Sequence, residues 1–168
     1  HLFLAADDLP RLGPLGDMRP RLASRDDVAA LWDHIDTTID CIATDHAPHT
    51  LEEKRDPDQA PPGVPGLETA LPLMLTAVAE GRLSLDRLVE LMAHNPRRIF
   101  GLPKQPDTGV LVDPQATYPL PHQGLHTKCG WSPFSGMTVQ GRIREVRLRG
   151  QTVFKDGEIA PIPIDSDR

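Results

Sequence analysis

The feature that most constrains the fold is a short apolar run that ends abruptly in acidic and imidazole side chains. Residues 39–44 read Ile-Asp-Cys-Ile-Ala-Thr and are followed at once by Asp-His-Ala-Pro-His at 45–49. The run has the length and composition of a buried β-strand. Residues 25–35 place apolar side chains at helical spacing after Ser24, a good helix N-cap. A helix followed by a buried strand that ends in polar residues indicates an α/β unit.

Two further helices are expected, one over residues 69–79 and one that begins after Ser84 and stops at Asn95-Pro96. Residues 1–22 contain many Pro and Gly residues and are expected to be a loop. Residues 50–66 are rich in charge, Pro and Gly and are expected to form a second, longer loop. Loops of that length without secondary structure are usually functional.

After residue 104 the pattern becomes that of a β module. Short apolar runs, a segment that alternates with period two and an Asp-Gly hairpin signal follow one another. The expected strands lie at 110–113, 138–143, 145–149, 152–155 and 158–159. The sequence therefore predicts two parts, an α/β part over 1–104 and a β-rich part over 105–168.

Composition narrows the class of partner and the compartment. The formal net charge is -6 and the basic residues are scattered, which argues against nucleic acid, because phosphate binding needs clustered Lys and Arg. The longest apolar run, 70–78, is too short to span a bilayer, so no membrane partner is expected. Two cysteines make neither a disulfide framework nor a zinc finger, and a reduced, cytoplasmic setting is expected.

Asp45 is the candidate for catalysis that the residues themselves indicate. In parallel β/α barrels, polar residues at the carboxyl ends of the strands form the active site. A carboxylate there can ligate a metal ion and move a proton. The alternative is that Asp45 caps the next turn and that His46 and His49 are ordinary surface residues.

Several segments resemble dihydroorotases of the amidohydrolase superfamily. Thr-Asp-His-Ala-Pro-His at 44–49 resembles their last-strand motif, and Gly-Val-Pro-Gly-Leu-Glu-Thr at 63–69 resembles the loop that follows it. Residues 95–101, 131–136 and 146–150 are similar to later family segments, in the expected order over nearly the whole chain. The resemblance is closest to the dihydroorotase domain of the animal multifunctional pyrimidine-synthesis protein. There the domain lies between carbamoyl-phosphate synthetase and aspartate transcarbamylase parts.

The resemblance implies a fold and a reaction. The fold would be α/β, the C-terminal part of a (β/α)8 TIM-type barrel plus part of a small β-sandwich domain. The reaction would be the reversible cyclisation of N-carbamoyl-L-aspartate to dihydroorotate and water in pyrimidine biosynthesis. Two zinc ions would share a hydroxide, and Asp45 would bind metal, accept the hydroxide proton and deliver it to the leaving amide nitrogen.

The resemblance also implies four substrate-binding residues. His49 would bind a substrate carboxylate through a charge-assisted hydrogen bond, and it separates dihydroorotases from allantoinases and hydantoinases. Pro62 and Gly63 would place backbone groups against the pyrimidine ring amide. Arg19 matches a family arginine that faces the substrate, after a shift of one residue. The alternatives are an exposed loop histidine, a plain Pro/Gly loop and a solvated surface arginine.

The other metal ligands of the family are not found in the sequence. The family site needs a His-x-His pair, a carboxylated lysine and two single histidines, and the chain contains no His-x-His pair. These ligands are expected before His1, so that the chain alone would be inactive, aggregate and bind zinc poorly. The parent is expected to be a homo-oligomer.

Two other functions stay open. One is a related cyclic amidohydrolase that acts on hydantoin, dihydropyrimidine or allantoin. The other is a non-catalytic dihydroorotase-like module that scaffolds a multienzyme chain.

Overall fold

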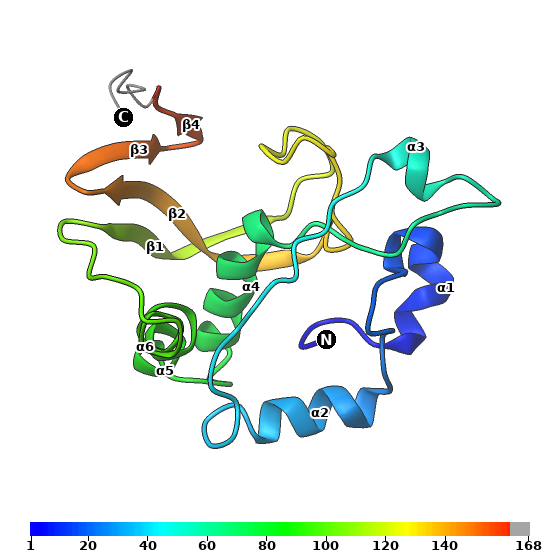
Figure 1. Ribbon diagram of the computed structural model, residues 1–168, viewed down its shortest axis with the longest axis horizontal. Coiled ribbons are helices and arrows are strands. Elements are labelled where there is room, and N and C mark those ends of the chain that lie inside the picture. The colour runs from blue at the N-terminus through cyan, green and yellow to red at the C-terminus, as the bar shows by residue number, and fades with distance from the viewer. Residues whose placement is uncertain (162–168) are drawn as a thin grey trace.

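The computed structural model describes residues 1–161 and has a mixed α/β fold, with helices first and an antiparallel sheet last (Figure 1). Residues 162–168 of the predicted β-rich part lie outside the described residues. The helical elements are η1 (Ala6–Asp8), α1 (Leu9–Leu12), η2 (Gly13–Gly16), α2 (Arg25–Asp33), α3 (Leu51–Lys54), α4 (Leu67–Ala79), α5 (Leu85–Val89), the π-helical turn η3 (Glu90–His94) and α6 (Asn95–Ile99). The strands are β1 (Gly109–Pro119), β2 (Thr138–Leu148), β3 (Gln151–Lys155) and β4 (Glu158–Ile159).

The predicted helices at the positions of α2, α4 and α5 are confirmed, and two of them begin at the predicted caps. Ser24 Oγ accepts from the Asp27 amide at 3.2 Å, and Asp27 Oδ2 accepts from the Ser24 amide at 3.0 Å. This capping box satisfies two amides that the first turn of α2 cannot bond internally. At α5, Ser84 Oγ accepts from the Arg87 amide at 3.1 Å.

Three predictions about helices and loops were wrong. Asn95-Pro96 does not stop a helix, because the π-helical turn η3 leads directly into α6 and Pro96 lies in its first turn, where its missing N–H costs little. Residues 1–22 contain η1, α1 and η2. Residues 50–66 contain α3, which Thr50 caps by accepting from the Glu53 amide at 3.2 Å.

The predicted strand at 39–44 does not join the sheet. The segment 39–50 runs from α2 to α3 as a ribbon without strand pairing (Figure 1). A strand needs a neighbouring backbone to bond, and the described residues offer this segment only isolated partners. The Ile42 amide donates to the Leu91 carbonyl at 3.0 Å, and the Ala47 amide donates to the Val64 carbonyl at 3.1 Å.

Side chains hold the start of this segment where a sheet would otherwise hold it. Arg87 donates to the Ile35 carbonyl at 2.9 Å and to the Ile39 carbonyl at 2.7 Å. Asn95 Nδ2 donates to the Asp40 carbonyl at 2.9 Å. Beneath these bonds lies a core of buried apolar residues from α4, α5, η3 and the link between α4 and α5, together with Ile35. They are Ile35, Met74, Leu75, Ala77, Leu83, Leu88 and Leu91.

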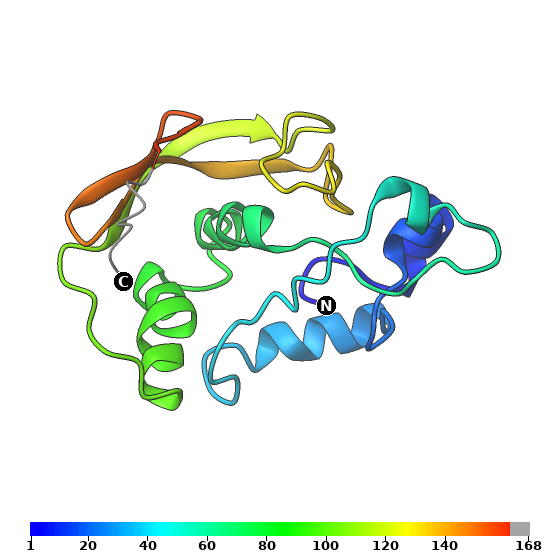
Figure 2. The ribbon, with the colours of Figure 1, turned by 45° about the horizontal axis from the view of Figure 1, so that its top comes forward.

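The sheet has the order β1-β2-β3-β4, each pair antiparallel, and it covers one side of α4 while α2 lies beyond the other side (Figure 2). The predicted strands and the Asp-Gly hairpin are confirmed, although β1 is longer than expected and two predicted strands merge into β2. Leu73 of α4 packs with Leu120 and Val139 in a second buried cluster. The sheet therefore packs directly on a helix from the predicted α/β part, and the division at 104–105 stays a prediction.

Gly141 sets how closely β2 approaches α4. Its φ is +98°, and a Cβ at this position would lie 2.7 Å from the Cβ of Leu75. The neighbouring atom is the inflexible base of a side chain, so the strand or the helix would have to move.

We predict that Gly141→Ala destabilises the fold by about 1–3 kcal/mol more than Gly157→Ala. Gly157 has nearly the same φ, +99°, but nothing lies within 4 Å of its would-be Cβ. The backbone cost is thus shared, and the difference isolates the clash with Leu75. Chemical unfolding of both variants in the same protein measures the difference, and equal losses would show that the close contact is not limiting.

Candidate active site

A cavity of about 400 Å³ lies where the N-terminal segment, residues 39–47, the 62–66 loop and α4 meet. Ligand sites commonly have about this volume. Four of the five predicted site residues line the cavity, namely Asp45, Arg19, Pro62 and Gly63. The rest of its wall is largely apolar. It includes Leu2, Phe3, Leu4, Ile42, Leu73 and Met74.

Asp45 presents a carboxylate to this cavity from a turn in the chain. Its φ is +45°, in the left-handed region that Asp tolerates better than most residues. The residue is exposed and does not cap the next helix, since Thr50 has that role in α3. The alternative of a capping aspartate is therefore wrong, and the carboxylate is accessible to a ligand.

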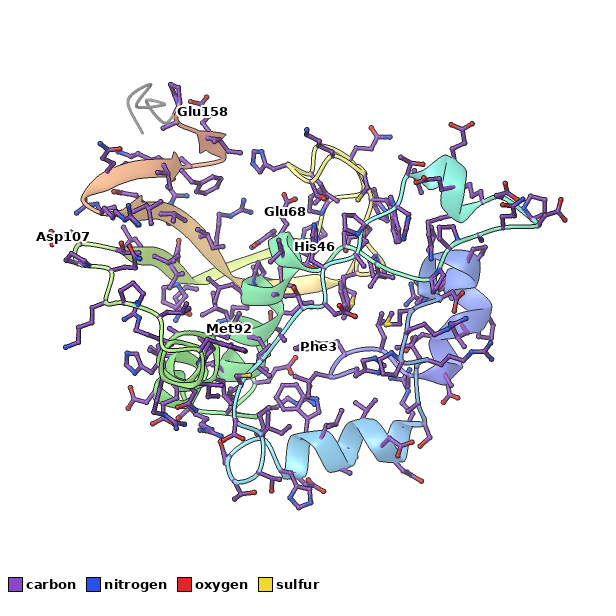
Figure 3. The ribbon with its side chains drawn as sticks, in the orientation of Figure 1. Phe3, His46, Glu68, Met92, Asp107 and Glu158 are labelled. Carbon is purple, nitrogen blue, oxygen red and sulfur yellow. The ribbon has the colours of Figure 1, made fainter. Side chains whose placement is uncertain are left out.

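His46 is bonded to the start of α4 and is not a free surface histidine (Figure 3). Its Nδ1 accepts from the Gly66 amide at 3.1 Å and from the Leu67 amide at 3.3 Å. The N-cap residue Gly66 has no side chain, and His46 supplies an acceptor from another segment to two amides at the start of the helix. This bond fixes the backbone immediately after Asp45.

His49 lies beside the cavity and does not line it. Its side chain is 31% exposed, and Nδ1 lies 4.0 Å from Glu53 Oε2. A Cβ on Gly63 would lie 3.2 Å from His49 Cδ2, so the ring packs against the Gly63 turn. The His49 carbonyl accepts from Trp131 Nε1 at 2.7 Å, which holds the backbone at this position.

The Pro62–Gly63 turn is held from two sides. The Gly63 amide donates to the Asp17 carbonyl at 2.9 Å, so the backbone group it can still offer a ring amide is its carbonyl. Its φ is +136°, and a Cβ would lie 2.6 Å from the Ala47 carbonyl oxygen. Only glycine fits this combination of backbone conformation and close contact.

Arg19 is exposed at the cavity rim and is partly held by its own loop. Its NH1 forms an ion pair with the Asp17 carboxylate and donates to the Met18 carbonyl at 3.1 Å. The guanidinium has five N–H donors, so donors remain for a substrate carboxylate.

Lys54 is a buried residue that the sequence analysis did not single out. Its side chain has 0% exposure. Nζ donates to the Asp17 carbonyl at 3.0 Å and to the Pro61 carbonyl at 2.8 Å. Thr50-x-x-Glu53 is a capping-box signal that would have predicted α3, but no pattern in the sequence predicts that this helix ends in a buried lysine.

Asp45 supplies a single carboxylate to the cavity. Among residues 1–161 no group of three or more His, Cys, Asp or Glu side chains is placed to hold a metal ion. An exposed carboxylate is nevertheless a suitable donor for zinc, and it can serve as one ligand of a larger set. Within the same residues, no helix is both long and apolar enough to cross a membrane.

Comparison with known proteins decides the family. No protein-family model matches the chain. It is 52% identical over 160 residues to multifunctional protein pyr1-3 of Dictyostelium discoideum, covering 95% of the chain and 7% of that protein. It is 40% identical over 169 residues to a dihydroorotase of Pyrococcus furiosus, covering 97% of the chain and 40% of that enzyme. Over nearly its whole length, the chain is similar to proteins of the dihydroorotase family. It spans well under half the length of these relatives.

Solved structures agree with this family and place it among related hydrolases. An L-hydantoinase (dihydropyrimidinase) from Arthrobacter aurescens matches 95% of the chain and 39% of its own, with a TM-score of 0.90 and 33% identity. An inactive dihydroorotase-like domain of a Chaetomium thermophilum CAD-like multifunctional protein matches 96% of the chain and 44% of its own, with a TM-score of 0.74 and 31% identity. The likeness thus includes a hydantoinase and a dihydroorotase-like domain described as inactive.

We predict that His46→Phe lowers the free energy of unfolding by about 1 kcal/mol, the usual value of a lost helix cap. Phenylalanine keeps a ring of similar size but leaves the Gly66 and Leu67 amides without their acceptor. His126→Phe is the control, because the described ring contact of exposed His126 is edge-on packing against Phe154. Chemical unfolding compares the two, and equal stability of both variants would contradict the capping role.

Proposed function

We propose that this chain forms part of a dihydroorotase that interconverts N-carbamoyl-L-aspartate and dihydroorotate in pyrimidine biosynthesis. The observation that carries the proposal is the accessible Asp45 carboxylate in the same cavity as the Pro62–Gly63 turn. The relatives named dihydroorotase support the reaction. Because the chain spans only part of these relatives, we propose that further residues of a longer protein complete the site.

The fold we propose for the complete protein is a (β/α)8 barrel with a small β-sandwich domain. Segment 39–44 is apolar and lacks strand partners in the described residues, which suits a strand that pairs with barrel strands encoded elsewhere. The apolar cavity wall, with the partly exposed Leu2, Phe3 and Ile42, suits a surface that packs against the rest of a barrel interior. Antiparallel strands β1–β4 would belong to the sandwich.

The metal we propose is zinc, in a binuclear site as in the family. Asp45 would be one ligand, and the others would come from residues outside this chain. When bound, zinc supplies Lewis acidity that activates water and polarises a carbonyl. The exposed position of Asp45 fits this role, because a ligand must reach the ion without first breaking bonds to its own protein.

Asp45 would carry the proton in the reaction. In the hydrolytic direction, water adds to a ring carbonyl, the ring C–N bond breaks, and the leaving nitrogen needs a proton. The Asp45 carboxylate accepts the proton that the attacking water gives up and returns it to that nitrogen. Ring closure runs the same steps in reverse, with the same carboxylate first accepting the proton from the amide nitrogen.

The neighbouring residues would recognise a small dianion. Carbamoyl aspartate has two carboxylates, and His49 and Arg19 offer N–H donors that bond such groups strongly. The Pro62 and Gly63 carbonyls would accept from the ring N–H. Because His49 packs against Gly63, His49 and the Pro62–Gly63 turn together would bind both a carboxylate and the ring amide of the substrate.

A non-catalytic scaffold is the second candidate, favoured by the likeness to an inactive dihydroorotase-like domain. Retention of Asp45 and of the glycine required at 63 favours the enzyme. The likeness to hydantoinases favours a related cyclic amidohydrolase only at the level of the fold and the superfamily. Fusion to carbamoyl-phosphate synthetase and aspartate transcarbamylase parts, a homo-oligomeric state and a cytoplasmic location are further proposals.

We predict that the full-length protein, loaded with zinc, converts carbamoyl aspartate to dihydroorotate, and that Asp45→Asn lowers kcat by about 10²–10⁴-fold. The amide cannot carry the proton. Asp40→Asn is the matched control, an exposed aspartate of the same segment that does not line the cavity. An assay of both directions measures the rates. A zinc-loaded wild-type protein with no turnover of either compound would refute the proposed dihydroorotase activity.

We predict that His49→Ala raises KM for dihydroorotate by about 10–100-fold, the effect of losing a hydrogen bond to a charged group. The zinc content of the protein should not change, because His49 does not line the cavity with Asp45. Steady-state kinetics with dihydroorotate, hydantoin, dihydrouracil and allantoin identify the substrate. Faster turnover of hydantoin, dihydrouracil or allantoin than of dihydroorotate would indicate that the protein is a related amidohydrolase.

A further inference from the structure

Three separate segments carry the proposed substrate-binding residues, and two side chains bond the backbone of all three. Arg19 lies two residues after Asp17, and the turn at 62–63 follows Pro61 directly. His49 lies near the end of segment 39–50. Lys54 donates to the Asp17 and Pro61 carbonyls. Trp131 donates to the His49 carbonyl. Lys54 Nζ also lies 6.0 Å from the centre of the Trp131 ring, at the outer limit of a cation-π interaction.

The Lys54 amine lies at the centre of this arrangement. Its side chain is fully buried, and both of its described hydrogen bonds go to backbone carbonyls, so it supports the backbone of the site. The Asp17 carbonyl that it bonds also accepts from the Gly63 amide at 2.9 Å. One carbonyl oxygen is thus shared between the buried amine and the turn proposed to face the ring amide.

Trp131 extends the same arrangement to the β-rich part of the chain. It is 4% exposed and packs with Leu4, Met18 and Val64 in one buried cluster. Its loop is tied to α4, because the Glu68 carboxylate accepts from the His126 and Thr127 amides at 3.1 Å each. The β-rich part therefore helps to fix the backbone that presents His49.

We propose that Lys54 is a positioning residue for substrate recognition, which holds the Arg19 segment and the Pro62–Gly63 turn in register while Trp131 holds His49. This inference rests on the proposed dihydroorotase function. A lysine that served only to fill space would be replaceable by an apolar side chain, since burying an ammonium costs free energy. Burial lowers the pKa of Lys54, in line with that cost. The amine instead reinforces the link between two backbone segments that the Gly63 amide and the Asp17 carbonyl also join.

The test is steady-state kinetics of the full-length, zinc-loaded protein with Lys54→Met. Methionine keeps the apolar stem and removes all three donors. We expect KM for dihydroorotate to rise about tenfold or more, because small displacements of positioning groups have large effects. We expect kcat to stay within about threefold and the zinc content to be unchanged, because Asp45 is held separately by His46.

Leu88→Ala controls for a loss of stability. Leu88 is 4% exposed in the core around α4 and does not line the cavity, so its truncation destabilises the fold without removing a residue of the site. We expect its KM to equal that of the wild type. A KM for Lys54→Met equal to the wild-type value, or a rise in KM shared by Leu88→Ala, would overturn the proposal.

Trp131→Phe carries the same test where Lys54→Met fails to fold. Phenylalanine keeps an aromatic ring beside Lys54 and loses the Nε1–H bond to the His49 carbonyl, so we expect KM to rise with kcat and zinc content unchanged. An unchanged KM would overturn the inference. The positioning role of Lys54 and the proposed function fail in different ways. An unchanged KM in an active protein would refute the positioning role, whereas an inactive wild-type protein would refute the function itself.

Discussion

The candidate site depends on one constraint, which is that its backbone segments have no sheet among residues 1–161 to hold them. Segment 39–50 and the loop at 55–66 lie side by side with a single described backbone bond between them, from the Ala47 amide to the Val64 carbonyl. Side chains add further bonds to the backbone of these segments, from Arg87 at the start, His46 in the middle and Lys54 with Trp131 at the end. These bonds help to pair backbone groups that no sheet pairs among the described residues.

Local signals in the sequence were sufficient for the elements that carry their own hydrogen bonds. Ser24 and Ser84 gave the starts of α2 and α5, and the Asp-Gly pair gave the last hairpin. The strand expected at 39–44 is not found, because an apolar composition indicates burial but not whether a neighbouring strand is present to pair with it. The stop expected at Asn95-Pro96 failed because a proline in the first helical turn, after a π-helical turn, is compatible with continuing the helix.

The site could be predicted only where a residue has a chemical or steric signature of its own. Asp45, Arg19, Pro62 and Gly63 meet at one cavity, as the resemblance to dihydroorotases implied, while their roles stay proposals. His49 lies beside the cavity, where sequence spacing could not place it. Lys54 was missed because its importance arises from carbonyls 37 and 7 residues away, and no local pattern encodes such contacts.

Asp45 is exposed, whereas Lys54 is buried and His46 is partly buried, and this difference suggests how proteins of this kind can include inactive domains. Loss of one exposed carboxylate would abolish proton transfer at little cost to the fold, since Asp45 caps no helix. Loss of His46 or Lys54 would leave backbone groups unpaired and weaken the same segment. An inactive descendant is therefore expected to lose Asp45 before its buried supports. Retention of the carboxylate together with the glycine at 63 therefore supports the proposed catalysis over scaffolding alone.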